Sequence, residues 1–357
     1  MSPDALRRAT RSTLFWPVVA LVALVIFDIV AVPGFLSLRV QDGHLYGSLV
    51  DILKNGTPTA LIALGMTLVI ATRGIDLSVG ATVAISGALA CSWIAAAPDP
   101  TAGSAAVVGV LLALALSLVL GLWNGFLVSV LGIQPIIATL VLMTAGRGLA
   151  QLITDGQIIT VANPLYAELG GGFLLGLPVS VVMAALLFLL VGLLVRRTAL
   201  GMLIESVGIN PAAARLSGVR ARGITLAVYV FVAVCACIAG LLISSNVTAA
   251  DANNAGLWIE LDAILAVVIG GTLLSGGRFS IVGTLVGALV LQTLTTTVYT
   301  AGIPPEVTLV FKAVVIIAVC LLQSPRTRAL LARRRRAAPS EAPPVEIVPT
   351  RNKVSQP

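Results

Sequence analysis

The sequence of 357 residues is poor in charge, because Asp, Glu, Lys and Arg together make up only 10% of it. Hydrophobic residues make up 58%, and the mean hydropathy is +1.06. This composition lies far outside that of water-soluble domains. A soluble fold is therefore excluded, and the lipid bilayer is the solvent of this chain.

The sequence also has few of the side chains from which catalytic and metal sites are built. Its one histidine is His44, and it contains neither an HExxH motif nor carboxylates with the spacing of a catalytic pair. We therefore expect no catalytic residue, no metal and no cofactor. The four cysteines form no CxxC motif and are expected to be packing residues; they are Cys91, Cys235, Cys237 and Cys320.

A phosphate-binding lysine is lacking as well. Residues 270–278, GGTLLSGGR, have the glycines of a phosphate loop. A nucleotide-binding P-loop needs a lysine directly after its last glycine, and Lys54, Lys312 and Lys353 all lie elsewhere. The chain is predicted not to hydrolyse ATP by that mechanism, so active transport would require a separate ATPase subunit.

Long apolar stretches recur along the chain. A helix needs roughly 20 apolar residues to cross about 30 Å of hydrocarbon. A β-barrel is excluded because runs such as residues 179–195 are apolar on every face. We predict an all-α polytopic membrane bundle of about ten transmembrane helices. The predicted spans are 14–33, 47–71, 76–97, 104–131, 135–153, 174–195, 223–246, 259–274, 279–299 and 306–323.

The placement of charge predicts the orientation. With the N-terminus inside and an even number of crossings, the cytoplasmic segments contain all of the 22 Lys and Arg except Arg39, Lys54, Arg147 and Lys312. Acidic residues fall in the opposite loops, at Asp99, Asp155, Glu168, Asp251, Glu260 and Glu306. This positive-inside pattern predicts that both termini are cytoplasmic. It accounts for the net charge of +7 without a nucleic-acid partner.

The same pattern divides the chain. Residues 1–13 are predicted to be a cytoplasmic tail and residues 14–325 the transmembrane domain, with a long cytoplasmic connection at 196–222. Residues 326–357 contain the run Arg333 to Arg336 and scattered prolines, without an apolar period. This basic tail is predicted to be disordered and to lie beside anionic lipid.

Within the cytoplasmic connection, residues 210–218 predict a short helix. Asn210 suits the N-cap, Pro211 the first helical position, and Gly218 the left-handed residue that ends a helix. Such a helix can lie in a groove of a soluble partner, although a plain surface turn fits the sequence too. The residues assigned to this contact are Gly208, Asn210, Pro211, Ala212, Ala213, Arg215 and Gly218.

Three further segments interrupt the apolar background. Between two spans, residues 71–80 contain Arg73 and Asp76, which can pair, while Asp76 or Ser78 caps the next helix. This segment is either a capped helix start or a helix break that lines a translocation path.

Asn124 lies late in a 28-residue span that must be strongly tilted or broken near residues 121–125. It is a candidate pore residue or an interhelical hydrogen-bonding residue.

Arg147 is the third interruption, twelve residues after Pro135 and therefore roughly 18 Å along a helix from its inner end. An arginine at this depth indicates either a functional site or a buried ion pair that fixes two helices. Its depth matches that of Asp28 and Asp262, which are the predicted partners.

Several motifs resemble the ribose-type sugar permeases of bacterial ABC importers over residues 45–323. These are GMTLVIA at 65–71, GIDLSVG at 74–80, LWNG at 122–125 and IQP at 133–135. Within that family, QDG at 41–43, ADANNAGLW at 250–258 and ELDAILA at 260–266 resemble the galactofuranose permeases. On this resemblance the translocation path is expected to include Asp76, Ser78, Asn124, Gln134 and Arg147.

The resemblance also implies partners. These are an ATP-binding cassette ATPase subunit, a periplasmic sugar-binding protein and a second permease subunit, the same chain or a related one. Residues 212–218 fall on the family's coupling motif, Glu-Ala-Ala-x-x-x-Gly, with Ala212 in place of the glutamate. Docking of the binding protein is assigned to Glu168, Asp251, Asn253, Asn254 and Glu306.

Two other functions compete with an importer. An ion-driven secondary transporter would use ionisable residues near the middle of the membrane, for which Arg147, Asp28 and Asp262 are candidates. A receptor or scaffold would move no solute at all. Dependence of uptake on ATP separates these possibilities from the importer.

Overall fold

The computed structural model describes residues 14–41 and 43–300, together with 302, 304, 307, 309, 310, 312–314, 317 and 321. The predicted tails, Glu306 and most of the predicted span 306–323 lie outside these residues. The described helices are α2 (Phe15–Ala31), α3 (Ser48–Ala71), α4 (Val79–Ala96), α5 (Gly103–Ser129), α6 (Pro135–Ile153), α7 (Pro164–Gly171), α8 (Val179–Arg197), α9 (Leu200–Ile209), α10 (Pro211–Leu216), α11 (Ala221–Asn246), α12 (Ile259–Ile269) and α13 (Ile281–Thr300).

Short antiparallel ladders join some of the helix ends. β1 (Arg39–Gln41) pairs with β2 (His44–Tyr46), β3 (Ile159–Thr160) with β6 (Ala249–Ala250), and β4 (Phe173–Leu174) with β5 (Leu177–Pro178). The β3–β6 ladder is the long-range one, with Ile159 opposite Ala250. It ties the segment after α6 to the segment after α11.

Seven of the described helices are long and apolar enough to cross a membrane: α3, α4, α5, α6, α8, α11 and α13. Helix α2 is apolar but has 17 residues, slightly fewer than a typical span. The predicted helical membrane bundle is confirmed, and the spans 47–71, 76–97, 104–131, 135–153, 223–246 and 279–299 each match a helix closely.

Two predicted spans are wrong in part. The span 174–195 begins late, because residues 173–178 form the β4–β5 hairpin, with positive φ angles at Leu175 and Gly176. The span 259–274 contains only the 11 residues of α12, which cover about 16 Å of the roughly 30 Å of hydrocarbon. Helix α12 ends just before Gly270, which lies against the backbone of Gly283. A Cβ added to Gly270 would lie 2.4 Å from the carbonyl carbon of Gly283. Apolar composition alone reveals neither the turn nor this close approach.

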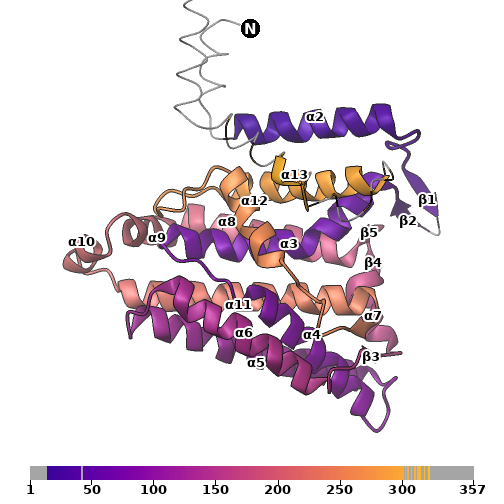
Figure 1. Ribbon diagram of the computed structural model, residues 1–357, viewed down its shortest axis with the longest axis horizontal. Coiled ribbons are helices and arrows are strands. Elements are labelled where there is room, and N and C mark those ends of the chain that lie inside the picture. Colours follow the sequence, from indigo (N-terminus) through magenta and orange to yellow (C-terminus); the bar gives the residue numbers. More distant parts are fainter. Residues whose placement is uncertain are drawn as a thin grey trace, which may run out of the picture.

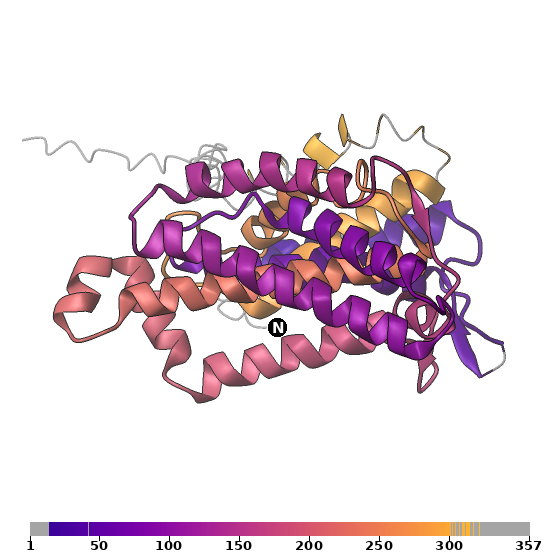
Figure 2. The same cartoon turned by 90° about the horizontal axis from the view of Figure 1, so that it is seen from below.

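Helix α11 lies in the centre of the bundle and packs against α3, α4 and α5 (Figure 2). A Cβ added to Gly65 of α3 would lie 2.8 Å from the Cα of Val232, and one added to Gly121 of α5 would lie 2.7 Å from the Cα of Val230. Lipid removes the hydrophobic driving force between helices, so small residues that let backbones approach closely hold the bundle together. Buried Cys91, Cys235 and Cys237 are free thiols within this packing.

The two ends of the bundle differ. Figure 1 shows α9 and α10 projecting from one end, while α7 and the ladders lie at the other. Helix α2 runs along the outside and packs against α13. Helices α4 and α12 begin inside the bundle rather than at either end (Figure 1), and the candidate site lies at these two helix starts.

Candidate translocation site

Asp76 organises the start of α4. Its Oδ1 accepts hydrogen bonds from the backbone N–H of Ser78 (2.8 Å) and from the Ser78 hydroxyl (2.6 Å). A carboxylate that accepts the N–H two residues further on forms a local turn, which here leads the chain into α4. Both side chains are buried. Asp76 thus holds the residue just before α4, but neither Asp76 nor Ser78 makes a side-chain capping bond to α4, so that prediction is wrong.

Arg73 does not pair with Asp76 in the described part of the chain, so that prediction is wrong. Residue 73 adopts a left-handed conformation (φ 64°), and its guanidinium donates to the carbonyl of Ile209 at the end of α9. The backbone turn after α3 thus directs the two charged side chains to different neighbours. Arg73 connects the break before α4 to the element that projects from the bundle.

Asn124 joins the same cluster from α5. Its Nδ2 donates to the Ser78 hydroxyl oxygen (2.8 Å), and the side chain is 1% exposed. Its Oδ1 has no hydrogen-bond partner among the described residues. The structure therefore brings together Asp76, Ser78 and Asn124. Of the two alternatives for this span, a strong tilt or a break near residues 121–125, the break is absent, because α5 is one helix of 27 residues in which Gly121 and Gly125 pack against α11.

Arg147 has partners other than those predicted. Its Nη1 donates to the carbonyls of Ala255 (2.6 Å) and Ala252 (3.1 Å), in the segment between β6 and α12. Helix α6 packs against α4 and α5, so the predicted partners lie on helices that are not its neighbours in the bundle. Depth along a helix does not determine which helix is adjacent.

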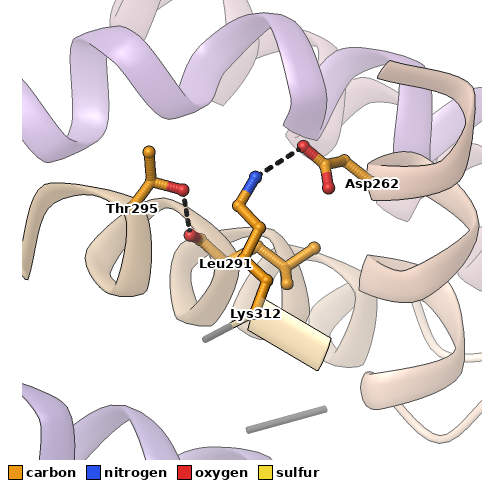
Figure 3. Close-up of polar contacts among 4 residues, drawn as sticks. All are labelled: Asp262, Leu291, Thr295 and Lys312. Atoms are coloured by element: carbon orange, nitrogen blue, oxygen red, sulfur yellow. Dashed lines mark hydrogen bonds and ion pairs between the residues drawn. The ribbon is translucent and has the colours of Figure 1, made fainter. Parts of the chain in front are cut away.

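The two predicted partners of Arg147 are engaged elsewhere. Asp28 of α2 accepts from the Thr297 hydroxyl of α13 (2.9 Å). Asp262 of α12 forms an ion pair with Lys312 (3.0 Å), as Figure 3 shows. Both contacts attach peripheral segments to the bundle.

The start of α12 meets the start of α4. A Cβ added to Gly80 would lie 2.7 Å from the carbonyl oxygen of Gly256 and 2.3 Å from Oε2 of Glu260. Glu260 is 3% exposed, and its Oε2 has no hydrogen-bond partner within the described residues, while its charge interacts with that of Arg147. Two helices that begin inside the protein therefore point their N-terminal ends at each other, with a carboxylate between them. The sequence had placed Glu260 in an outer loop, which the structure contradicts.

Other buried polar residues of the site were missed from the sequence. Tyr229 of α11 is fully buried, and its hydroxyl lies close to Gly74. A Cβ added to Gly74 would lie 2.6 Å from that oxygen. Thr139 of α6 accepts a hydrogen bond from the N–H of Leu77 (3.1 Å). The signal for both was a single polar side chain within an apolar span. Gln134, in contrast, is exposed at the start of α6 and makes no capping bond, so it does not join the cluster.

The predicted short helix is present as α10. Asn210 Oδ1 accepts from the N–H groups of Ala212 and Ala213 (3.1 Å each), Pro211 is the first helical residue, and Gly218 has φ +84°. Helix α9, which the sequence did not predict, precedes it. At Gly208 an added Cβ would collide with the carbonyl oxygen of Ala71, so α9 lies directly on the end of α3.

Of the residues assigned to binding-protein docking, Glu168 lies on α7, at the end of the bundle opposite α10 (Figure 1), and Asp251, Asn253 and Asn254 follow β6. Glu168 is exposed on α7. Asp251 accepts from the N–H groups of Asn253 and Asn254 and from the Asn254 side chain (2.7 Å), and these bonds hold the pKa of its carboxyl below the usual range. Asn253 accepts in turn from Gln151. Among the described residues no group of three or more His, Cys, Asp or Glu can hold a metal ion.

The family model described as "branched-chain amino acid transport system / permease component" matches residues 48–320. The galactofuranose transporter permease protein of Escherichia coli (strain K12) is 48% identical over 93% of this chain and 97% of its own length. The fructose import permease protein of Bifidobacterium longum (strain NCC 2705) is 41% identical, with 94% and 95% covered. The ribose import permease protein of Bacillus subtilis (strain 168) is 37% identical, with 77% and 84% covered.

No solved structure matches the chain. The family match covers most of the sequence, and the relatives align over nearly their whole lengths. This chain belongs to the permease-component family of membrane transport systems.

Proposed function

We propose that the chain is the membrane-spanning permease subunit of an ABC sugar importer in the bacterial inner membrane. Its cargo is a monosaccharide, galactofuranose or a related pentose or hexose. The names of three relatives, permeases for galactofuranose, fructose and ribose, support a sugar. The structural observation that carries the proposal is the buried polar cluster where α4 and α12 begin inside the bundle.

Sugar passage explains why these polar groups lie in an apolar protein. A sugar exchanges hydrogen bonds with water for bonds with the protein, and buried polar atoms are costly unless they are paired. Three such atoms, Asn124 Oδ1, the Tyr229 hydroxyl and Glu260 Oε2, have no hydrogen-bond partner within the described residues. In the proposed path they become available to sugar or water when the helices move, together with Asp76, Ser78 and Arg147. Gln134 lines the exposed end of this path.

The proposed topology has ten crossings with both termini in the cytoplasm. Residues 14–325 form the permease domain, residues 196–222 are the coupling loop, and residues 1–13 and 326–357 are cytoplasmic tails. The arginines at 196, 197, 215, 220 and 222 lie around α9 and α10, at one end of the bundle, which supports a cytoplasmic face there.

The proposed partners bind at opposite ends. The ATPase subunit binds α10 through Ala212, Ala213 and Arg215. This chain is not an enzyme, and ATP is hydrolysed on the ATPase subunit. A periplasmic sugar-binding protein docks on Glu168, Asp251, Asn253, Asn254 and Glu306. A second permease subunit, identical or related, completes the path.

Movement of the ATPase reaches the path through two contacts. In the first contact, Gly208 of α9 lies on the end of α3. In the second, Arg73, three residues before Asp76 in the sequence, donates to the last carbonyl of α9. A displacement of α9 and α10 therefore shifts the segment that leads into α4. This short connection supports a mechanical coupling between ATP closure and the buried cluster.

Transport by the reconstituted complex tests the proposal. The chain is purified with its ATPase subunit, placed in liposomes with the binding protein, and supplied with labelled galactofuranose, ribose or fructose. We expect uptake that requires ATP and persists when the membrane potential is collapsed. Uptake without ATP, driven by an ion gradient, would replace the importer with a secondary transporter.

A further inference from the structure

An apolar groove of about 440 Å³ lies between α3, α8, α9 and α11, at the end of the bundle from which α10 projects. Its walls include Leu68, Val191, Leu194, Ile204, Ala227 and Phe231. Along α11 it reaches from Gly223 to Phe231, eight residues or about 12 Å. Its depth is thus comparable to the outer part of a lipid acyl chain.

Four arginines lie in or beside the groove, at the end of α8 and the start of α11. Arg220 lines it, Arg222 precedes the lining residue Gly223, and Arg196 and Arg197 follow the lining residue Val195. All four side chains are exposed, and none makes an ion pair or hydrogen bond with another described residue. Positive charge without a protein partner therefore gathers where the groove meets the membrane surface.

We propose that this groove is a binding site for an anionic phospholipid, with one acyl chain along α11 and the phosphate among the arginines. Apolar walls at this depth match hydrocarbon, and guanidinium groups form paired hydrogen bonds with phosphate oxygens. Basic pockets between transmembrane helices at the cytoplasmic side favour anionic headgroups. The site does not depend on which solute the permease carries.

Charge argues against other occupants. The segments beyond the described residues carry Arg7, Arg8, Arg11 and the run from Arg333 to Arg336, which the groove's arginines repel. A second copy of the chain would bring the same four arginines to the contact. A polar segment of a soluble partner would bury unpaired backbone groups against apolar walls. An anionic lipid satisfies both the walls and the charge.

The position of the site gives it a consequence for coupling. Leu200 and Ile204 of α9 form part of the wall, and α9 continues into α10. A bound lipid fills the space between α9 and the membrane-spanning helices α8 and α11. It thereby supports the element that we propose to contact the ATPase subunit.

Native mass spectrometry of the full-length chain in detergent tests the site. The protein is titrated with phosphatidylglycerol or with phosphatidylcholine that has the same acyl chains. We expect the protein to bind one phosphatidylglycerol about fivefold more tightly than phosphatidylcholine. Arg220→Gln should lower the affinity for phosphatidylglycerol by about fivefold, the effect of one basic residue at a membrane surface. Gly223→Leu should also release it, because an added Cβ meets nothing within 4 Å and the side chain enters the groove.

Two matched variants serve as controls. Arg215→Gln removes an arginine of α10 that already binds the carbonyl of Pro211, and Gly192→Leu adds the same side chain to α8 outside the groove. Both should retain the lipid. If Gly223→Leu does not yield folded protein, Ala227→Leu fills the groove from the next turn of α11.

The proposal is overturned by any of three results. These are equal retention of the two lipids, retention of phosphatidylglycerol unchanged by both Arg220→Gln and a groove-filling variant, or equal loss in the controls. Excess inorganic phosphate should leave the lipid bound. Displacement by phosphate would mean a site for free anions and would also reject a lipid site.

Discussion

At the scale of single residues, the Ser78 hydroxyl connects three parts of the chain. It donates to the Asp76 carboxylate and accepts from the Asn124 amide. One hydroxyl group therefore joins the break after α3, the start of α4 and the C-terminal part of α5. Buried networks of this kind are stable only when each member keeps its partner, so small substitutions should have large effects.

Asn124→Ala tests this network. The substitution removes the donor to Ser78 and leaves a buried hydroxyl less well paired, at a cost of about 1 to 2 kcal/mol in unfolding free energy. We expect a lower melting temperature in detergent and loss of ATP-driven uptake. Ser117→Ala is the matched control in α5, since that hydroxyl binds Leu114 of its own helix. Uptake equal to wild type in Asn124→Ala would remove this residue from the path.

The hydrogen bonds of Asp251 should make the stability of the loop before α12 depend on pH. Hydrogen bonds from Asn254 and from two backbone N–H groups lower the pKa of its carboxyl, so the stabilisation is present above the unfolded pKa of about 3.9. This stabilisation is lost as the pH falls through the lower pKa that Asp251 has in the folded protein. Hydrogen exchange of residues 251–258 should accelerate below about pH 4 beyond its intrinsic pH dependence. Asp251→Asn should lack this added change, and an identical profile in the variant would contradict the assignment.

At the scale of elements, the connection between α3 and α9 relates the projecting end to the buried cluster. The carbonyl of Ala71 accepts from Gly277 while lying against Gly208, so the end of α3, helix α9 and the segment after α12 meet at one point. A side chain at position 208 would have to push these backbones apart.

Gly208→Val should therefore weaken coupling. Overpacking of this kind costs about 1 to 3 kcal/mol, and displaced α9 and α10 would meet the ATPase subunit poorly. We expect less ATPase subunit to co-purify and less ATPase stimulation by the binding protein. Gly192→Val, at an open position of α8 outside the groove, is the control. A normal complex with Gly208→Val would show that α9 transmits no movement.

The Asp262–Lys312 ion pair ties α12 to the described part of the last apolar segment (Figure 3). The side chains are 28% and 15% exposed, so loss of one partner should cost between about 1 kcal/mol, as for exposed pairs, and about 3 kcal/mol, as for buried ones. Asp262→Asn and Lys312→Met should each lower thermal stability, and the combined variant should recover part of the loss. Strictly additive losses would show that the two charges do not interact.

At the scale of the whole molecule, the sequence predicted what depends on local order. Continuous apolar helices follow from composition, and the cap at Asn210 follows from residues two and three positions away. Contacts between distant residues were not predictable in the same way. The neighbour of Arg147 depends on which helices pack together, and the burial of Glu260 depends on α12 starting inside the bundle. Sequence motifs therefore located Asp76, Ser78 and Asn124, whereas the structure was needed to bring them together and to add Glu260 and Tyr229.

The meeting of α4 and α12 is the property of the whole bundle that transport should depend on most. Gly80→Ala places a Cβ against Glu260 and Gly256, so the two helix starts must separate even though the coupling end is untouched. We expect uptake to fall by about tenfold, equivalent to about 1.4 kcal/mol in the barrier, while the ATPase subunit still co-purifies. Gly148→Ala, where an added Cβ meets nothing within 4 Å, controls for the glycine change. Normal uptake by Gly80→Ala would show that sugar passes elsewhere, whereas loss of uptake with an intact complex would place the moving part of the path at these two helices.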